Sequence, residues 1–258
     1  MSGRLKFNAA MIAALTVAVV LASWVIHGIL QRDARQHVLQ RANLLMAAAE
    51  ATRSYTTNFI KPHLDGRLDV EFLPQTVPAF AATETVLSLR KQFPEYTYKE
   101  ATLNPTNPRN RTTDWEADIV NIFRADFAKT EIVGERMQGP VASLYIAKPL
   151  KVSSPSCLSC HATPSSAPAS LIKLYGEANG FGWKNNEIIG AQIVSVPVSV
   201  SEGSSSGPFW MIVGLLVALS AVALLVGNLM FGRNGGASSP AATPKADESA
   251  GSRRWAQR

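Results

Sequence analysis

Both cysteines of this 258-residue chain lie in one short stretch, SPSCLSCHATPSSAP, which covers residues 154–168. Cys157 and Cys160 are three positions apart, and His161 follows at once. The spacing Cys-x-x-Cys-His lets two thiols add to the two vinyl groups of a haem while the adjacent imidazole reaches the iron from the same side. The sequence therefore predicts one covalently bound haem c, held by Cys157, Cys160 and His161.

Three other interpretations of the motif are weaker. A disulfide or a thioredoxin-type redox pair needs only Cys-x-x-Cys and gives His161 no role. A structural zinc site needs four ligands, and because there is no second cysteine pair, His37 and His63 would both have to converge on the motif. Inert thiols do not suit an exported, oxidising setting.

The second axial position of the iron is not specified by the sequence. The candidate ligands are His63, Met46, Met137 and Tyr55, and an open position is the alternative. Of the four we favour His63, although a histidine after Pro62 also suits a surface turn. Met46 is most simply explained as helix packing.

Haem also has two propionates and a large apolar ring. Arg109 and Arg111 are the predicted propionate partners, because a guanidinium can hold a carboxylate through two hydrogen bonds. As loop residues they can equally be solvated charges. Four aromatic side chains are candidates for the wall of the ring, or else for plain core: Tyr145, Phe181, Trp183 and Trp115.

Two uncharged runs are long enough as helices to cross a bilayer. They cover residues 7–31 and 209–231. The first run follows Arg4 and Lys6 and could be read as a cleaved signal peptide, but it exceeds the usual apolar length of about 7–15 residues, so a retained anchor is favoured.

The net charge of +6 lies in the flanks of the chain, because residues 32–207 hold 18 basic against 17 acidic residues. Basic ends outside two spans indicate cytoplasmic termini and an exported middle rather than nucleic-acid binding. The predicted division is a cytoplasmic start with the first span (1–31), an exported haem domain (32–207), the second span (208–232) and a disordered cytoplasmic tail (233–258).

The exported region should hold helices around a small antiparallel sheet. After the first span, a seam at steps of four and three residues from Val38 to Phe59 predicts a continuing helix, which packs on its own domain or forms a parallel stalk in a homodimer. Further helices are predicted over 79–93 and 114–127, the second opened by a capping box of Thr113 and Glu116 and burying Trp115, Ile119, Phe123 and Phe127. Strands are predicted from Tyr96, over 141–152 and over 187–200, which gives an α+β domain.

The chain resembles PAS-like periplasmic haem c domains, a family long catalogued as a domain of unknown function and found in bacterial membrane sensors. The resemblance covers roughly residues 36–200 and is carried by YTTNFIKPHL, FLPQTVPAFAA, FPEYTYKEATLNPTNPRNRTTDWEADIV, SLYIAKPL, SCLSCHATPSSAP and NGFGWKNNEIIGAQIVSVPV. It implies a PAS-like antiparallel sheet flanked by helices, with haem on Cys157 and Cys160 and iron on His161. Together with the two apolar runs and the charge pattern, it leads us to expect a two-span protein of the bacterial inner membrane with its haem domain in the periplasm.

Two functions follow from a single haem. A sensor would change redox state or bind a small ligand such as a diatomic gas and bias the flanking helices, whereas an electron carrier would hold the iron between two fixed ligands. We favour the sensor, on the resemblance and the two-span layout. Such a sensor would act through its dimer or a signalling or redox partner protein. No distal acid–base group suggests a peroxidase, so an enzyme is not predicted.

Overall fold

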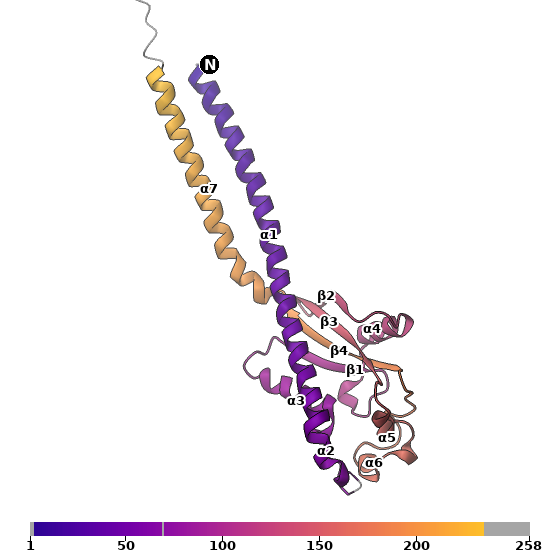
Figure 1. Cartoon of the computed structure of the whole chain (residues 1–258). Helices are drawn as coiled ribbons and strands as arrows, with labels where there is room; N and C mark the ends of the chain where they lie inside the picture. Colours follow the sequence, from indigo (N-terminus) through magenta and orange to yellow (C-terminus); the bar gives the residue numbers. More distant parts are fainter. Residues whose placement is uncertain (1–2, 69, 235–258) are drawn as a thin grey trace, which may run out of the picture. The chain divides into compact units, whose positions relative to one another are not determined.

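The computed structural model describes residues 3–68 and 70–234 and divides into two compact units. Its helices and strands follow one another in the order shown in Figure 1. They are α1 (Gly3–Tyr55), a π-helix (Thr56–Ile60), α2 (Lys61–Leu64), α3 (Pro78–Leu89), β1 (Thr97–Thr102), α4 (Asp114–Ala125), β2 (Ile132–Gln138), β3 (Val141–Lys151), α5 (Leu158–His161), α6 (Ala169–Tyr175), β4 (Ile188–Pro197) and α7 (Ser199–Asn234).

One unit consists of the outer parts of α1 and α7, residues 3–25 and 210–234 of the described chain. Both helices are long and apolar enough to cross a membrane, with mean hydropathy of 2.4 and 2.7 over their most apolar windows. Inside this unit the Asn8 side-chain amide donates a hydrogen bond to the Asn228 side-chain oxygen at 3.1 Å. The predicted disordered tail lies outside the described residues from 235 onward.

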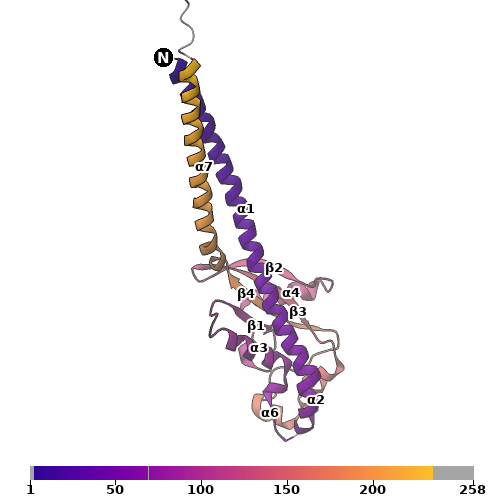
Figure 2. The same ribbon diagram turned by 60° about the vertical axis from the view of Figure 1, so that its left-hand side comes forward.

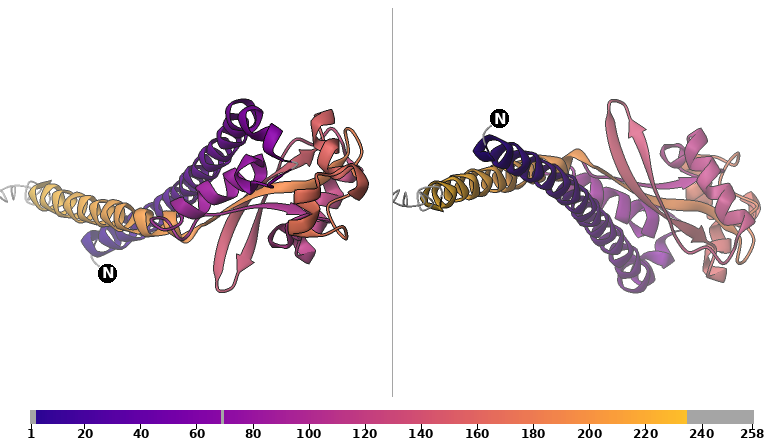
Figure 3. Two further views of the ribbon diagram at one scale, coloured as in Figure 1. Left: turned by 90° about the horizontal axis from the view of Figure 1, so that it is seen from below. Right: turned by 90° about the horizontal axis from the view of Figure 1, so that it is seen from above.

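The second unit, residues 26–209, is built on a four-stranded antiparallel sheet in the order β1-β4-β3-β2. Helices α1 and α3 cover one face of the sheet and α4 covers the other (Figure 3). This arrangement confirms the predicted α+β class. Strand β2, which pairs with β3 along its whole length, was not predicted from the sequence.

The later half of α1 packs on the sheet of its own unit. Its buried stripe is Val38, Ala42, Leu45, Met46 and Ala49, which meets the inward side chains of Leu144, Ile146, Val194 and Val196. The predicted seam is therefore covered by its own domain, which is the first of the two predicted arrangements. Only its last member, Phe59, stays outside at 62% exposure.

Helix α4 covers the opposite face and begins as predicted. Thr113 and Glu116 form the capping box, and Ile119 and Phe123 are buried against the sheet. Phe127 was expected on the same buried stripe but is 67% exposed. The helix ends at Ala125, so Phe127 no longer follows the helical period.

A buried polar network joins α1 to the sheet. The Arg53 guanidinium donates to Glu100 of β1 at 2.6 Å, and the Tyr98 hydroxyl donates to the same carboxylate at 2.7 Å. The Glu100 side chain is only 3% exposed and that of Arg53 is 24% exposed. Burial lowers the pKa of Arg53, but the charge of Glu100 and its hydrogen bond, together with the charges of Tyr98 and Glu50, outweigh burial and raise the net pKa. Burial, followed by the negative charge of Glu100, raises the pKa of Tyr98.

Breaking this pair should be costly and asymmetric. Arg53→Met leaves the Glu100 carboxylate buried without its counter-charge and should cost about 3–5 kcal/mol, or about 6–15 °C in Tm. Glu100→Gln removes the buried negative charge but keeps an amide that can hydrogen-bond to Arg53. Because the Arg53 guanidinium is partly exposed to water, this substitution should lower the free energy of unfolding by only about 1–2 kcal/mol. Thermal unfolding of the detergent-solubilised chain, followed by circular dichroism, measures both.

The control for this comparison is Arg67→Met, which breaks an exposed pair with Glu71 and should cost less than about 0.5 kcal/mol. Equal losses from Arg53→Met and Glu100→Gln would contradict the assignment of Glu100 as the buried charge.

Candidate functional site

The Cys-x-x-Cys-His motif is folded as one helical turn. A 3₁₀ turn over Pro155–Cys157 leads directly into α5, and Cys157 itself has helical angles. Residues three and four apart on a helix lie on the same face, so Cys157, Cys160 and His161 share one side of the turn. Both thiols are free and half-buried.

His161 is fixed through one ring nitrogen. Its Nδ1 donates a hydrogen bond to the carbonyl oxygen of Gly180 at 2.8 Å, and the Thr106 hydroxyl lies 3.5 Å from the same nitrogen. The ring stacks on the indole of Trp183 with centroids 3.8 Å apart. Burial lowers the pKa of His161, although the Gly180 hydrogen bond acts in the opposite direction. The hydrogen bond to Gly180 engages Nδ1 and leaves Nε2 as the ring nitrogen available to bind a metal.

Two turns distant in sequence close around His161, and we call them the ligand cradle: residues 104–106 and residues 179–183. Asn104, just after β1, accepts a hydrogen bond from the Gly180 amide at 3.2 Å and donates to the Phe181 carbonyl at 3.4 Å. The Trp183 amide in turn donates to the His161 carbonyl at 3.2 Å. The orientation of the imidazole thus depends on the end of a sheet strand.

Gly180 is required for the cradle on two grounds. Its φ of +86° belongs to the left-handed region that side-chain-bearing residues rarely adopt. A Cβ at this position would also collide with the side chain of Thr106. Only glycine lets the two turns approach closely enough to place the Gly180 carbonyl against His161.

The two arginines predicted for the propionates have protein partners. Arg109 pairs with Glu84 of α3 at 2.6 Å and lies over the Phe80 ring. Arg111 donates to the Asn179 side chain at 3.2 Å, which brings it to the edge of the ligand cradle. Of the two, Arg111 is therefore the one placed beside the motif.

The predicted aromatic wall divides into two groups. Trp183 and Phe181 belong to the ligand cradle. Tyr145 and Trp115 instead contact each other, with centroids 5.4 Å apart, and pack against the core cluster of α4. The structure thus places Trp183 against His161 and places Tyr145 elsewhere.

The candidates for the second axial position also separate. Met46 is buried between α1 and the sheet, as helix packing predicts. Met137 lies on β2, the edge strand opposite β1. Tyr55 stacks on Phe59 at the end of α1, and His63 is exposed on α2, at the same end of the domain as α6 (Figure 2).

The donors present fit a haem c better than the alternatives. Two unpaired thiols and an imidazole with one tethered nitrogen share a face, which is what two thioether bonds and one axial bond require. A zinc site would need His37, which instead pairs with Asp33 on α1. No group of three metal-ligating side chains converges within residues 3–68 and 70–234.

The sequence reading missed Asn104 and Gly180 as contributors. The signal was present in the turn residues Asn104 and Pro105 and in the glycines of the NGFGW run. Such residues indicate turns but do not show which distant turn meets which.

Fold and site together define an α+β domain bearing a Cys-x-x-Cys-His motif on one helical turn. A family model described as Tll0287-like matches residues 31–197, which include the whole motif and the sheet. The chain belongs to the Tll0287-like family.

The chain is also similar to a solved structure described as the cyanobacterial heme-protein Tll0287. The two are 16% identical with a TM-score of 0.49, and the match covers 62% of this chain and 94% of the other. None of the curated proteins compared is similar enough to count as a relative.

Closing the ligand cradle can be tested at Gly180. In Gly180→Ala the alanine would have to adopt a positive φ, and its Cβ would collide with Thr106. The substitution should therefore destabilise the domain by about 2–4 kcal/mol. Gly176→Ala is the matched control, because it has a φ of +77° with open space around it and should cost only about 1 kcal/mol. Thermal unfolding compares the two, and equal losses would show that the contact with Thr106 does not matter.

Proposed function

We propose that this chain is a membrane-anchored protein of the bacterial inner membrane that carries one covalent haem c on a PAS-like domain in the periplasm. The observation that carries this proposal is the helical turn presenting Cys157, Cys160 and His161 on one face, with His161 tied to Gly180. Family membership supports it, because the family's namesake Tll0287 is a haem protein.

The roles of the residues follow from their positions. Cys157 and Cys160 would form the two thioether bonds, and Nε2 of His161 would be the iron ligand. Trp183 restrains the imidazole by stacking, and the Gly180 carbonyl strengthens its basicity through the Nδ1 hydrogen bond. When bound, haem supplies an iron that changes oxidation state or takes up a small ligand.

The two apolar helices support the membrane location. The charge pattern of the flanks favours cytoplasmic termini, which leaves the haem domain on the outer side of the membrane. An oxidising compartment also suits covalent attachment through two thiols.

Within this proposal, the protein acts as a sensor of redox state or of a small ligand such as a diatomic gas. The arrangement of the second axial candidates supports an exchangeable position, since Met46 is in the core and Met137 pairs with Ala142 at the start of β3, whereas the motif follows the end of that strand. The alternative is a single-haem electron-transfer cytochrome, in which His63 or another fixed residue fills that position.

Covalent attachment is tested by a pyridine haemochrome assay and the intact mass of the full chain. Wild type should weigh its polypeptide plus one haem and stain for peroxidase activity on a denaturing gel. The double variant Cys157→Ala/Cys160→Ala should lose both signals, whereas Ser159→Ala, between the cysteines, should keep them. A wild-type mass equal to the bare polypeptide would refute the proposal.

Sensor and carrier are separated by spectra of the reduced protein with CO or NO. A sensor with an exchangeable position should shift its Soret and α bands in wild type and equally in His63→Ala. Bands that do not respond in wild type but respond in His63→Ala would identify His63 as a fixed ligand and favour the carrier.

A further inference from the structure

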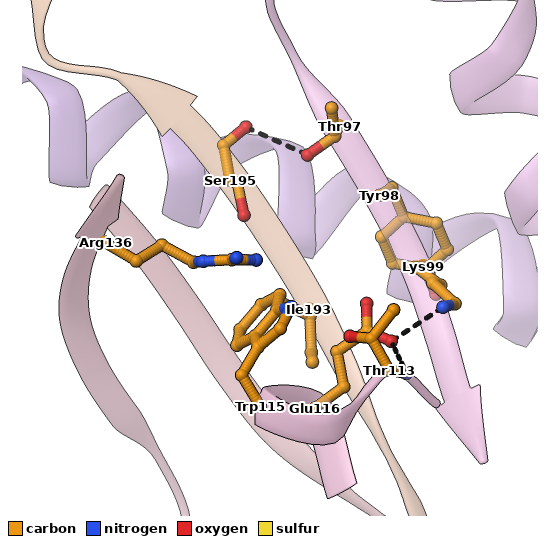
Figure 4. Close-up of a pocket in the computed structure, with 9 residues that line it drawn as sticks. All are labelled: Thr97, Tyr98, Lys99, Thr113, Trp115, Glu116, Arg136, Ile193 and Ser195. Carbon is orange, nitrogen blue, oxygen red and sulfur yellow. Dashed lines mark hydrogen bonds and ion pairs between the residues drawn. The ribbon is translucent and has the colours of Figure 1, made fainter. Parts of the chain in front are cut away.

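A cavity lies on the sheet face that carries α4, beside the first turn of that helix (Figure 4). It has a volume of about 310 Å³, within the lower range of small-molecule sites. Its walls come from β1, β2 and β4 and from the first turn of α4. The residues that matter for its chemistry are Lys99, Glu116, Arg136, Trp115, Ser195 and Ile193.

This cavity is separate from the ligand cradle. It lies beside Thr97 at the start of β1, whereas Asn104 of the cradle follows the other end of that strand. Lys99, the last cavity-lining residue on β1, is five residues before Asn104, which at about 3.3 Å per residue is about 16 Å along an extended chain.

The charges around the cavity do not cancel. The Lys99 ammonium is paired with Glu116 at 2.6 Å, and Glu116 also accepts a hydrogen bond from the Thr113 amide in the capping box. The Arg136 guanidinium instead lies 3.9 Å over the Trp115 ring. Within the described part of the chain Arg136 has no carboxylate partner, so one positive charge is left uncompensated.

Polar and apolar surfaces meet beside this charge. Ser195 of β4 contributes a hydroxyl, while Trp115 and Ile193 contribute apolar walls. Ser143 pairs directly with Arg136 across β3 and β2, so their side chains share a face. The Ser143 side-chain oxygen is buried and lacks a hydrogen-bond partner among the residues described, and Ser143 as a whole is 1% exposed.

We propose that this cavity binds a small organic monocarboxylate. Arg136 would hold the carboxylate through its fork of N–H groups, and the organic part would lie against Trp115 and Ile193. The single uncompensated positive charge, that of Arg136, would be neutralised by one carboxylate. A dianion would be disfavoured by Glu116, whose carboxylate faces the same space.

Calorimetric titration of the full haem-loaded chain tests this site. The probes are acetate, propionate, butyrate and benzoate, each compared with its neutral amide at equal concentration. At least one carboxylate should bind while its amide does not, because the amide cannot satisfy Arg136. The Soret band should stay unchanged, since the site is away from the iron.

The variant Arg136→Gln should weaken the binding about tenfold or more, and Arg67→Gln, an exposed arginine outside the cavity, should leave it within about twofold. Arg136→Met, which keeps the stem packed on Trp115, is the second variant if the first fails to fold. The proposal is overturned if no probe binds at 10-millimolar levels (about the weakest useful affinity). It is also overturned if amides bind as well as carboxylates, if binding shifts the Soret band, or if the folded variants bind like wild type.

Discussion

The site depends on one hydrogen bond, from Nδ1 of His161 to the carbonyl oxygen of Gly180. A side chain at the end of a four-residue helix has little to fix its direction, because so short a helix is not stable alone. The Gly180 carbonyl supplies that direction, and it is itself positioned by Asn104 after β1. The orientation of the imidazole is thereby fixed relative to the sheet.

Helix α1 has two physical roles along its length. Its first part is uncharged and apolar over a length that could cross a membrane, whereas its later part buries a single stripe against the sheet. The buried Arg53–Glu100 pair lies in this later part. Apolar packing can tolerate small sliding of a helix, but a buried ion pair is lost with displacement, so this pair sets the register of α1 on β1.

Local features could be predicted from the sequence, and the partners of distant residues could not. The helical turn of the Cys-x-x-Cys-His motif and the capping box at Thr113 depend on neighbours within four residues. The periodic apolar pattern from Val38 to Phe59 predicts a helix with one buried side. It does not show which surface covers that side, because the covering residues lie on β3 and β4, far away in the sequence. Strand β2 was missed because Gly134, Glu135 and Arg136 interrupt its apolar pattern. The cavity beside Arg136 was not predicted either, because Arg136 lies on this strand. Arg109 was assigned to a ligand because its partner, Glu84, is 25 residues away.

Strand β4 lies inside the sheet, hydrogen-bonded to β1 on one side and β3 on the other, and α7 begins two residues after it ends. Tension applied through α7 would therefore act along the length of β4, loading both ladders of hydrogen bonds together instead of opening them one at a time. A strand held in this manner resists extraction far better than a peeled edge strand. The domain is consequently attached to its second apolar helix through a central strand of its sheet, not through an edge strand.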